Sequence, residues 1–240
     1  MRLGIISALA EEQQGLIEAF EGPYKHIHGM REYTTGKLWE IDAVCVLSRI
    51  GKVAAAMTAA ILVEKFGVTH IVFTGVAGSG DKNVKVGDIV IAEALVQHDF
   101  DASPLFPQFE IPLTGLSRFA TDVALTERLA NAAAKTTRVH RGLIASGDQF
   151  IGKLTQIQAI KAGLPDLLAV EMEGAAVAQV CFELGIPFAV IRTISDNAND
   201  DAAVDFMHFI KTVASRYAFE VIHNFCHSGV RSTIATRAEV

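Results

Sequence analysis

The sequence predicts an α/β protein, a single-domain three-layer sandwich in which a central mixed β-sheet is flanked by helices. The first observation is that short apolar runs rich in β-branched residues alternate with segments of helical periodicity, which is typical of strands buried on both faces. The second is a hairpin-like segment near the N-terminus, which makes the sheet mixed. The third is length, because 240 residues are enough for one large domain, and no Pro- or Ser-rich linker separates the chain into two.

The first part of the chain supplies strands, helices and the hairpin. Residues 3–7 are apolar and are expected to form a strand, followed by a helix that extends to about residue 20. Residues 25–39, which contain the sequence Thr-Thr-Gly-Lys, are expected to form the antiparallel hairpin. Residues 43–47 are the next apolar run, and residues 53–66 follow it with a helical pattern.

Five further apolar runs are expected to be strands because they are short and bounded by polar or glycine-containing segments. They are residues 70–73, 88–96, 141–145, 167–170 and 188–191. Residues 205–225 are expected to form one long closing helix. The sequence after Cys226 is polar and aperiodic, so we expect a poorly ordered tail there.

The charge balance excludes several classes of partner. A formal net charge of −6 and a pI near 5.7 leave no broad basic surface, so a small molecule is expected as partner, and no nucleic acid or membrane. No run of about 18 apolar residues and no signal-peptide pattern is found, which predicts a cytoplasmic protein. The three cysteines, Cys45, Cys181 and Cys226, are far apart, so buried thiols are expected rather than disulfides or a cysteine-based metal site.

Carboxylates follow three of the predicted strands. Glu171 and Glu173 come directly after residues 167–170, Asp196 comes shortly after residues 188–191, and Glu12 comes after the first strand. Open α/β sheets keep their ligands at the carboxyl ends of the strands. The sequence therefore predicts acid/base chemistry at one site on this edge of the sheet.

Each of these groups also has a structural interpretation. Glu12 and its neighbour Glu11 stand where a helix would begin, and the helix dipole favours acidic residues there. Asp196 fits a loop in which its side chain bonds to local backbone groups. Arg192 is costly at the end of an apolar strand unless it has a carboxylate partner, and Glu12 or Glu173 is the expected one.

Two other segments have the composition of a binding site. The small residues 74–80 would let a ligand approach the backbone, or form a tight turn after the strand, but they lack the spacing of nucleotide phosphate-binding loops. His98, Asp99 and Asp101 have the composition of metal ligands, although a hydrogen-bonded loop is the favoured interpretation. No metal and no cofactor is expected.

Taken together, these segments resemble the 5'-methylthioadenosine/S-adenosylhomocysteine nucleosidases of the nucleoside phosphorylase superfamily. The resemblance covers nearly the whole chain and depends on motifs in a fixed order. They are Gly4-Ile5-Ile6 with Glu12, Ile50-Gly51-Lys52-Val53-Ala54-Ala55, Thr74-Gly75 with Ala77-Gly78, Lys85-Val86-Gly87-Asp88-Ile89-Val90, Arg141-Gly142-Leu143-Ile144 with Ser146-Gly147-Asp148, Phe150-Ile151, Ala169-Val170-Glu171-Met172-Glu173, and Arg192 with Ile194-Ser195-Asp196. The resemblance implies a nucleosidase domain over residues 1–226 and a C-terminal tail over residues 227–240.

The resemblance implies hydrolysis of the N-glycosidic bond of 5'-methylthioadenosine and S-adenosylhomocysteine, which yields adenine and the 5'-thioribose. Asp196 would be the general acid that protonates N7, oriented by Ser195, and Glu12 would be the general base that activates water. Glu173 would accept hydrogen bonds from the ribose hydroxyls, while Met172 packs on the sugar.

The remaining implied contacts surround the base and the 5' substituent. Phe150 would stack on adenine, the backbone of Ile151 would bind its edge, and Ile50 and Phe206 would form an apolar 5' pocket. Arg192 would hold the carboxylates on the water side. Further substrate contacts are implied for Glu171 and for the small residues Val76, Ala77 and Gly78, and Val76 stands where the family usually has serine.

The family completes its 5' pocket with a loop from a second subunit, so a homodimer is expected, with residues 102–112 as that loop. Three alternatives remain open at this point. A phosphorolytic relative would need cations for phosphate, and Glu12 would repel that anion. Hydrolysis of another adenine nucleoside, such as aminofutalosine, would use the same acid and base. A non-catalytic nucleoside-binding protein would not need Glu12 and Asp196.

Overall fold

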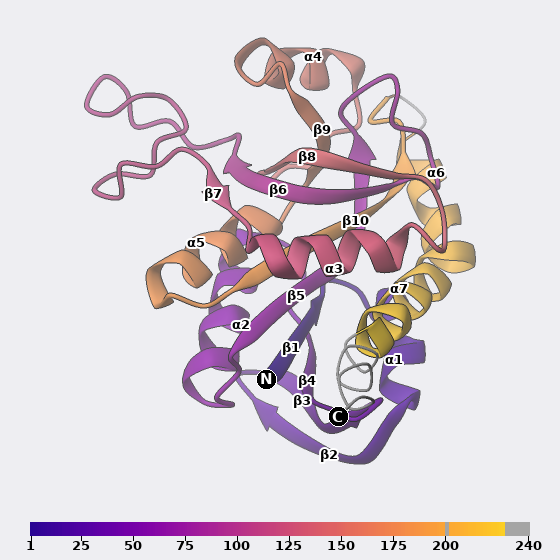
Figure 1. The fold of residues 1–240 in the computed structure, drawn as a ribbon. Coiled ribbons are helices and arrows are strands. Elements are labelled where there is room, and N and C mark those ends of the chain that lie inside the picture. The colour runs from indigo at the N-terminus through magenta and orange to yellow at the C-terminus, as the bar shows by residue number, and fades with distance from the viewer. Residues whose placement is uncertain (200–201, 229–240) are drawn as a thin grey trace, which may run out of the picture.

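A mixed β-sheet runs through the centre of the structure, with helices on both of its faces (Figure 1). The computed structural model describes residues 1–199 and 202–228. The strands are β1 (Arg2–Ser7), β2 (Phe20–His28), β3 (Arg31–Leu38), β4 (Ile41–Leu47), β5 (His70–Ser79), β6 (Ile89–Gln97), β7 (Phe119–Ala120), β8 (Val139–Ser146), β9 (Leu167–Glu171) and β10 (Phe188–Asp196). The helices are the 3₁₀ turn η1 (Ala10–Glu12), α1 (Gln14–Glu18), α2 (Lys52–Glu64), α3 (Val123–Ala133), α4 (Leu154–Gly163), α5 (Gly174–Leu184), α6 (Ala202–Phe209), the π segment η2 (Ile210–Ala214) and α7 (Ser215–Ser228).

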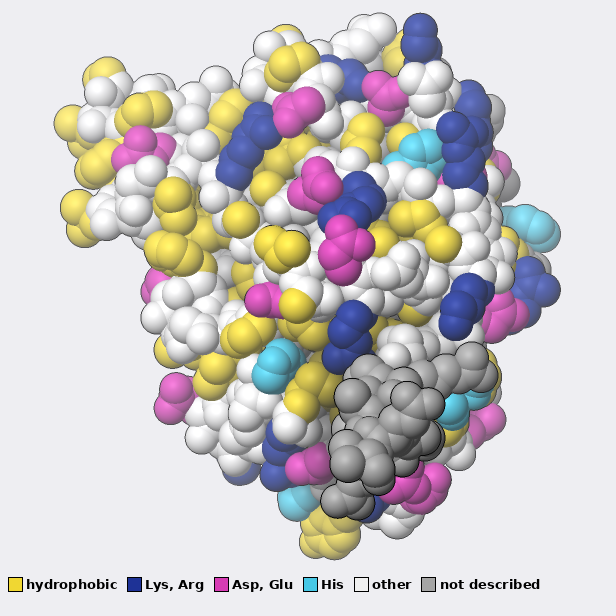
Figure 2. Space-filling model, viewed as in Figure 1, with side chains coloured by type: hydrophobic (Ala, Val, Ile, Leu, Met, Phe, Trp, Pro, Cys, Tyr) yellow, Lys and Arg dark blue, Asp and Glu magenta, His cyan; other side chains and the backbone are white. Residues whose placement is uncertain are grey.

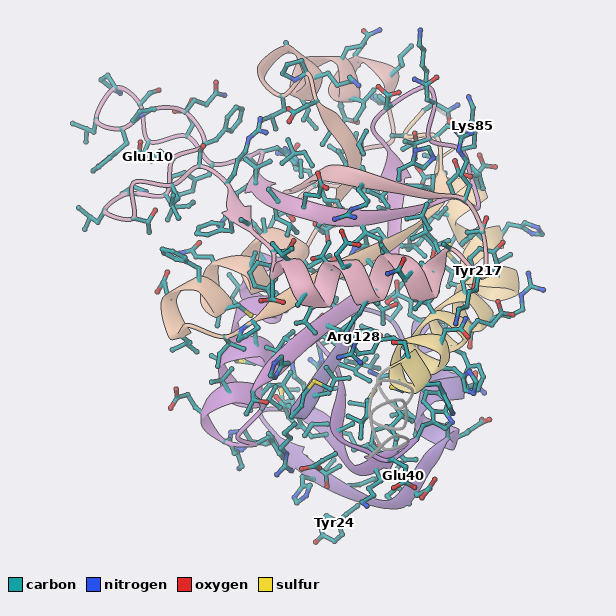
Figure 3. The ribbon with its side chains drawn as sticks, viewed as in Figure 1. Tyr24, Glu40, Lys85, Glu110, Arg128 and Tyr217 are labelled. Atoms are coloured by element: carbon teal, nitrogen blue, oxygen red, sulfur yellow. The ribbon has the colours of Figure 1, made fainter. Side chains whose placement is uncertain are left out.

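Alternate residues of the central strands enter different apolar cores. On β1, Ile6 packs into the core that contains α2 and α5, whereas Ile5 packs into the core that contains α1, α3 and α7. Arg128 of α3 lies over the ring of Phe225 of α7, 4.5 Å from its centre, on the second face (Figure 3). The strands are therefore buried on both faces, which confirms the predicted three-layer α/β arrangement with a mixed sheet.

The sheet closes on itself at one end, which the sequence does not reveal. β5 pairs in parallel with β1 and β10 and in antiparallel orientation with the end of β9. β10 also pairs with β6, β6 pairs with β8, and β8 pairs with β9. Because β9 pairs with β5, these strands form a closed ring. This closure brings the ends of β5, β9 and β10 together.

Two predicted strands are longer than expected. β5 continues through the glycine-rich segment to Ser79, so the prediction of a loop or tight turn there is wrong. β10 continues to Asp196 because it pairs with β5 along that whole length. Small residues permit this close pairing: a Cβ atom on Gly78 would lie only 3.0 Å from Oδ1 of Asp196.

The N-terminal segment also departs from its prediction. The expected helix up to residue 20 is only a 3₁₀ turn followed by the short helix α1, because the Glu12 side chain accepts the backbone N–H groups of Ala8 and Leu9 and holds a tight turn there. The hairpin of β2 and β3 is present, but it turns at Gly29 and Met30, which both have positive φ angles of 55° and 59°.

The closing helix is divided. α6, the π segment and α7 replace the single helix expected over residues 205–225, because the π segment inserts a wider turn that offsets the hydrogen-bond pattern. α7 extends to Ser228, and residues 229–240 of the predicted tail lie outside the described residues. All three cysteines are free and buried, as predicted. Within residues 1–199 and 202–228, no helix is long and apolar enough to cross a membrane.

Candidate active site

A cavity of about 320 Å³ lies where β1, β5, β9 and β10 end. Its lining residues are Ala8, Leu9, Glu12, Ile50, Val76, Ala77, Gly78, Gln149, Phe150, Ile151, Val170, Glu171, Met172, Glu173, Ser195, Asp196 and Phe206. The volume is in the range of small-molecule sites. The position agrees with the rule that ligands of α/β sheets bind at the carboxyl ends of the strands.

The structure brings together every residue predicted for the site except Arg192, which lies behind the cavity wall. It adds Ala8, Leu9, Gln149 and Val170, which the sequence reasoning missed. Two of these four, Gln149 and Val170, directly precede the predicted residues Phe150 and Glu171, so their position in the sequence was the available signal.

Glu12 is buried in the cavity wall, and three backbone N–H groups point at its carboxylate. Its Oε2 accepts from Ala8 N over 2.8 Å and from Leu9 N over 2.9 Å, while Oε1 accepts from Val76 N over 3.2 Å. Burial raises the pKa of Glu12, although these hydrogen bonds and the charge of Arg192 oppose the rise. The arrangement fixes the carboxylate and leaves it more basic than an exposed glutamate.

Asp196 ends β10 and is also buried. Ser195 Oγ donates to its Oδ2 over 2.8 Å, and Ala198 N donates to its Oδ1 over 2.9 Å. Burial raises the pKa of Asp196 despite these two bonds, and the negative charge of Asp205 adds to the rise. A raised pKa keeps a carboxyl group protonated to higher pH than usual, which suits a general acid.

Arg192 forms its ion pair with Glu171, so the expected pairing with Glu12 or Glu173 is wrong. Its Nη2 lies 2.6 Å from Glu171 Oε2, and both side chains are almost fully buried. The guanidinium group also stacks on the ring of Phe73, 4.0 Å from its centre. The other two carboxylates have backbone partners instead: Glu12 accepts from Ala8 N, Leu9 N and Val76 N, and Glu173 accepts from Gly51 N.

Glu171 in turn fixes the backbone that follows it. Its Oε2 accepts from Glu173 N, both of its oxygens accept from Gly174 N, and the Ser146 hydroxyl donates to its Oε1. Glu173 is thereby oriented at the start of α5, and its Oε1 accepts from Gly51 N over 2.8 Å. Glu171 lines the cavity, but its oxygens are engaged in holding Arg192 and this turn.

The rest of the lining is largely apolar. Phe150 and Phe206 meet edge to face, with ring centres 5.8 Å apart. Ile50 and Phe150 are 55% and 46% exposed, so the cavity has an apolar mouth where a ligand could bury further surface. A flat aromatic group and an apolar substituent both fit such walls.

Comparisons with known proteins agree with this geometry. The model of the Phosphorylase superfamily matches residues 2–225. A 5'-methylthioadenosine/S-adenosylhomocysteine nucleosidase of Shewanella denitrificans is 37% identical over 224 residues, which cover 92% of this chain and 97% of that protein. The chain belongs to the 5'-methylthioadenosine/S-adenosylhomocysteine nucleosidase family. It is therefore an N-glycoside hydrolase by family.

Solved structures extend the comparison with this nucleosidase family. The S. pneumoniae nucleosidase in complex with the transition-state inhibitor MT-ImmA has a TM-score of 0.89 and 36% identity, covering 94% of this chain and 98% of that one. A futalosine hydrolase of Helicobacter pylori has a TM-score of 0.88 and 32% identity, covering 95% of this chain and 98% of that one. The predicted fold class and the predicted family are both confirmed.

The loop after β6 has a role in hydrogen bonding. Asp99 Oδ1 pairs with Lys52 Nζ over 2.6 Å, and Asp101 Oδ1 accepts from Ser103 N over 2.8 Å. Among the described residues, no group of three or more His, Cys, Asp or Glu side chains is arranged to hold a metal ion. Asp99 and Asp101 thus take part in the hydrogen-bonded loop that the sequence favoured.

Glu173→Gln should stabilise the protein at alkaline pH. Burial, with the nearby charge of Glu171, raises the pKa of Glu173 to about 8. A carboxyl whose pKa is raised in the folded state contributes stability below its unfolded value near 4.5, and this contribution is lost as the pH rises through 8. Urea unfolding at pH 5 and pH 8.5 should show that the variant gains at least about 1.4 kcal/mol relative to wild type between the two pH values, the equivalent of one pKa unit.

The control is Glu64→Gln, which makes the same change at an exposed position in the last turn of α2. It should leave the difference in unfolding free energy between the two pH values unchanged. An equal pH dependence for Glu173→Gln and wild type would contradict the raised pKa.

Proposed function

We propose that this chain cleaves the N-glycosidic bond of 5'-methylthioadenosine and S-adenosylhomocysteine with water, which releases adenine and the 5'-thioribose. The observation that carries the proposal is that two buried carboxyls with raised pKa values, Glu12 and Asp196, line one apolar cavity of nucleoside size. The family supports the same reaction. No cofactor is needed for it.

The reaction requires one acid and one base. As adenine departs, the ribose becomes oxocarbenium-like, and protonation of N7 by Asp196 keeps the leaving base neutral. Glu12 accepts the proton of the water that attacks C1', and ionised Glu12 also favours the positive charge on the sugar. Ser195 orients Asp196 through its hydrogen bond.

The other groups bind the substrate. Glu173 accepts from the ribose hydroxyls, with Met172 against the sugar, and Phe150 stacks on adenine while the Ile151 backbone binds the base edge. Ile50 and Phe206 contact the 5' substituent, and Ala77 and Gly78 allow the nucleoside to approach the backbone. Val76 contributes its backbone N–H, which holds Glu12. Arg192 acts indirectly, through Glu171.

The cavity favours water over phosphate as the nucleophile. Among the described residues no Lys or Arg lines it, and the cation behind it, Arg192, is already paired with Glu171. A phosphate anion would therefore meet the Glu12 carboxylate without a compensating cation. Hydrolysis of another adenine nucleoside remains the second candidate, because a futalosine hydrolase shares the fold at 32% identity.

Adenine release tests this function. The purified chain is incubated with 5'-methylthioadenosine, S-adenosylhomocysteine and aminofutalosine, with and without phosphate, and adenine is quantified. Release from the first two substrates at a rate independent of phosphate is the expected result. Activity on aminofutalosine alone would favour the second candidate, phosphate dependence would indicate a phosphorylase, and binding without release would indicate a nucleoside-binding protein.

We also propose a cytoplasmic homodimer. The segment between β6 and β7, which carries Glu110, projects from the body of the molecule (Figures 1 and 3). Several hydrophobic side chains gather on its surface (Figure 2), and Leu105 and Leu113 are 85% and 94% exposed. An exposed apolar loop of this kind fits an interface with a second copy, whose loop would complete the apolar mouth of the cavity.

The solution mass tests the dimer. Light scattering at micromolar concentration should give twice the mass of the 25.8 kDa chain. Leu105→Asp should shift the protein towards the monomer and raise KM for 5'-methylthioadenosine by about tenfold, since a charge in an apolar interface is costly. A fully active monomeric wild type would refute the proposal. Val123→Asp changes another exposed apolar residue, at the start of α3, and should leave the mass unchanged.

A further inference from the structure

A ring of three side chains outside the cavity joins the segments that form two of its walls. Lys52 begins α2, Asp99 follows β6 and Asp148 follows β8. Lys52 Nζ donates to Asp99 Oδ1 over 2.6 Å, Asp99 Oδ2 accepts from Asp148 N over 2.9 Å, and Asp148 Oδ1 accepts from Lys52 N over 2.8 Å. Each member therefore contacts the other two. None of them lines the cavity.

The ring is attached directly to a residue of the proposed ribose site. Gly51 precedes Lys52, and its N–H donates to Glu173 Oε1 over 2.8 Å. Gly51 has a φ of 98°, a conformation that favours glycine, and a Cβ atom there would lie 3.1 Å from Asp148 Oδ1. The Asp148 carboxylate thus packs against Gly51 and bonds to the next N–H along the chain.

The first N–H groups of α2 have no partners within the helix, so they must bond elsewhere. Glu173 takes one and Asp148 takes the next, and the favourable dipole at this helix end strengthens both bonds. Lys52 supplies the counter-charge: its side chain and that of Asp99 are 16% and 15% exposed, and Lys52 Nζ also donates to Gln97 Oε1 over 3.0 Å. Burial works to raise the pKa of Asp99, but the bonds from Lys52 and Asp148 outweigh it, so the pKa is lowered and the carboxylate stays ionised.

We propose that Lys52, Asp99 and Asp148 are positioning residues for ribose recognition: the ring holds the Gly51 N–H against Glu173, and so leaves the other Glu173 oxygen oriented for the sugar hydroxyls. This inference rests on the proposed function, because it concerns the same Glu173. It assigns a task to three residues that do not contact the substrate. The ring also fixes the backbone two residues before Phe150, which joins the ribose side of the cavity to its aromatic side.

The consequence is a specific kinetic signature. When the ring is broken, the Gly51 N–H is free to move and Glu173 loses its fixed orientation. The ribose hydroxyl that Glu173 binds should then contribute less to kcat/KM. Substrate analogues without that hydroxyl should be affected less than the ribose substrate. A mere loss of stability would lower turnover of both substrates by the same factor.

Lys52→Met tests this, because it retains the length of the aliphatic stem while removing the ammonium group. The measurement is the ratio of kcat/KM for 5'-methylthioadenosine to kcat/KM for its 2'-deoxy and 3'-deoxy analogues. The ratio should fall at least tenfold relative to wild type for one of the two analogues. Lys52→Arg, which can still bond to Asp99, should restore most of it. Asp99→Asn breaks the ring from its other side and should lower the same ratio, which covers the case in which Lys52→Met does not fold.

Lys161→Met is the matched control. Lys161 forms a half-buried ion pair with Asp81 over 3.0 Å, and it lies outside the cavity lining. Its substitution also removes an ion pair and should lower the melting temperature, while leaving the ratio unchanged. An unchanged ratio in both Lys52→Met and Asp99→Asn would overturn the inference, as would an equal change in Lys161→Met. If wild type releases no adenine from any substrate, the proposed function fails instead.

Discussion

Asp196→Asn should lower kcat on 5'-methylthioadenosine by about 10²- to 10⁴-fold, the usual contribution of a general acid. The amide has nearly the same shape, so the hydrogen bonds with Ser195 and Ala198 can be retained on one side, but it cannot deliver a proton to N7. An analogue with a base that leaves without protonation should be hydrolysed by the variant at close to the wild-type rate. The comparison of the two substrates isolates the proton transfer from any change in binding.

The pH dependence provides a second measurement. The acid must be protonated to act, and burial raises the pKa of Asp196, so wild-type activity should extend to higher pH than an exposed aspartate would allow and fall as the pH rises through that pKa. The charge of Asp205 contributes to the rise. Asp205→Asn is therefore the control: it should move the alkaline limb to lower pH while kcat at the optimum stays near wild type. Equal loss on natural and activated bases in Asp196→Asn would show that the acid is another group.

The sequence predicts the layers of the fold because their signal is local. Each central strand is an apolar run with β-branched residues, and apart from the carboxyl ends of β5 and β10 each was placed within a few residues of its observed bounds. The extension of β5 through the glycine-rich segment was not visible, because small residues lower strand propensity and only pairing with β10 makes that segment a strand. Closure of the sheet at β5 and β9 depends on contacts between distant segments, which no local pattern encodes.

In the candidate site, too, the identity of the residues could be predicted from the sequence, whereas their contacts could not. Its carboxylates and apolar residues could be named from their places after strands and from the family resemblance, and the structure places all of them in one cavity except Arg192. The partner of Arg192 was misassigned because Glu171 and Glu173 are only two residues apart, and the direction of each side chain decides which of them faces the strand below. The ring at Lys52 was missed because its members, at the start of α2 and in the segments after β6 and β8, are far apart in the sequence and only the fold brings them together.

Glu12→Gln should reduce kcat by a similar factor, about 10²- to 10⁴-fold, but with a different substrate dependence. The variant lacks the base that accepts the proton of water, so the activated analogue should be impaired as much as the natural substrate. All three groups that bond to the Glu12 carboxylate are N–H donors, from Ala8, Leu9 and Val76. A glutamine oxygen can serve the first two, while its amide nitrogen would then face the N–H of Val76 without an acceptor.

The control for this substitution is Glu11→Gln, at the exposed neighbour in the same 3₁₀ turn. It should keep full activity, and both variants should bind adenine with affinities within about threefold of wild type, as measured by calorimetry. The pKa of Glu12 is raised by burial, and a base must be ionised to act, so wild-type kcat should decline as the pH falls through that value. That acid limb should disappear from the residual activity of Glu12→Gln, because the amide does not titrate. Full activity of Glu12→Gln, or survival of its acid limb, would assign the base to another residue and leave Glu12 with the structural task of holding the turn between β1 and α1.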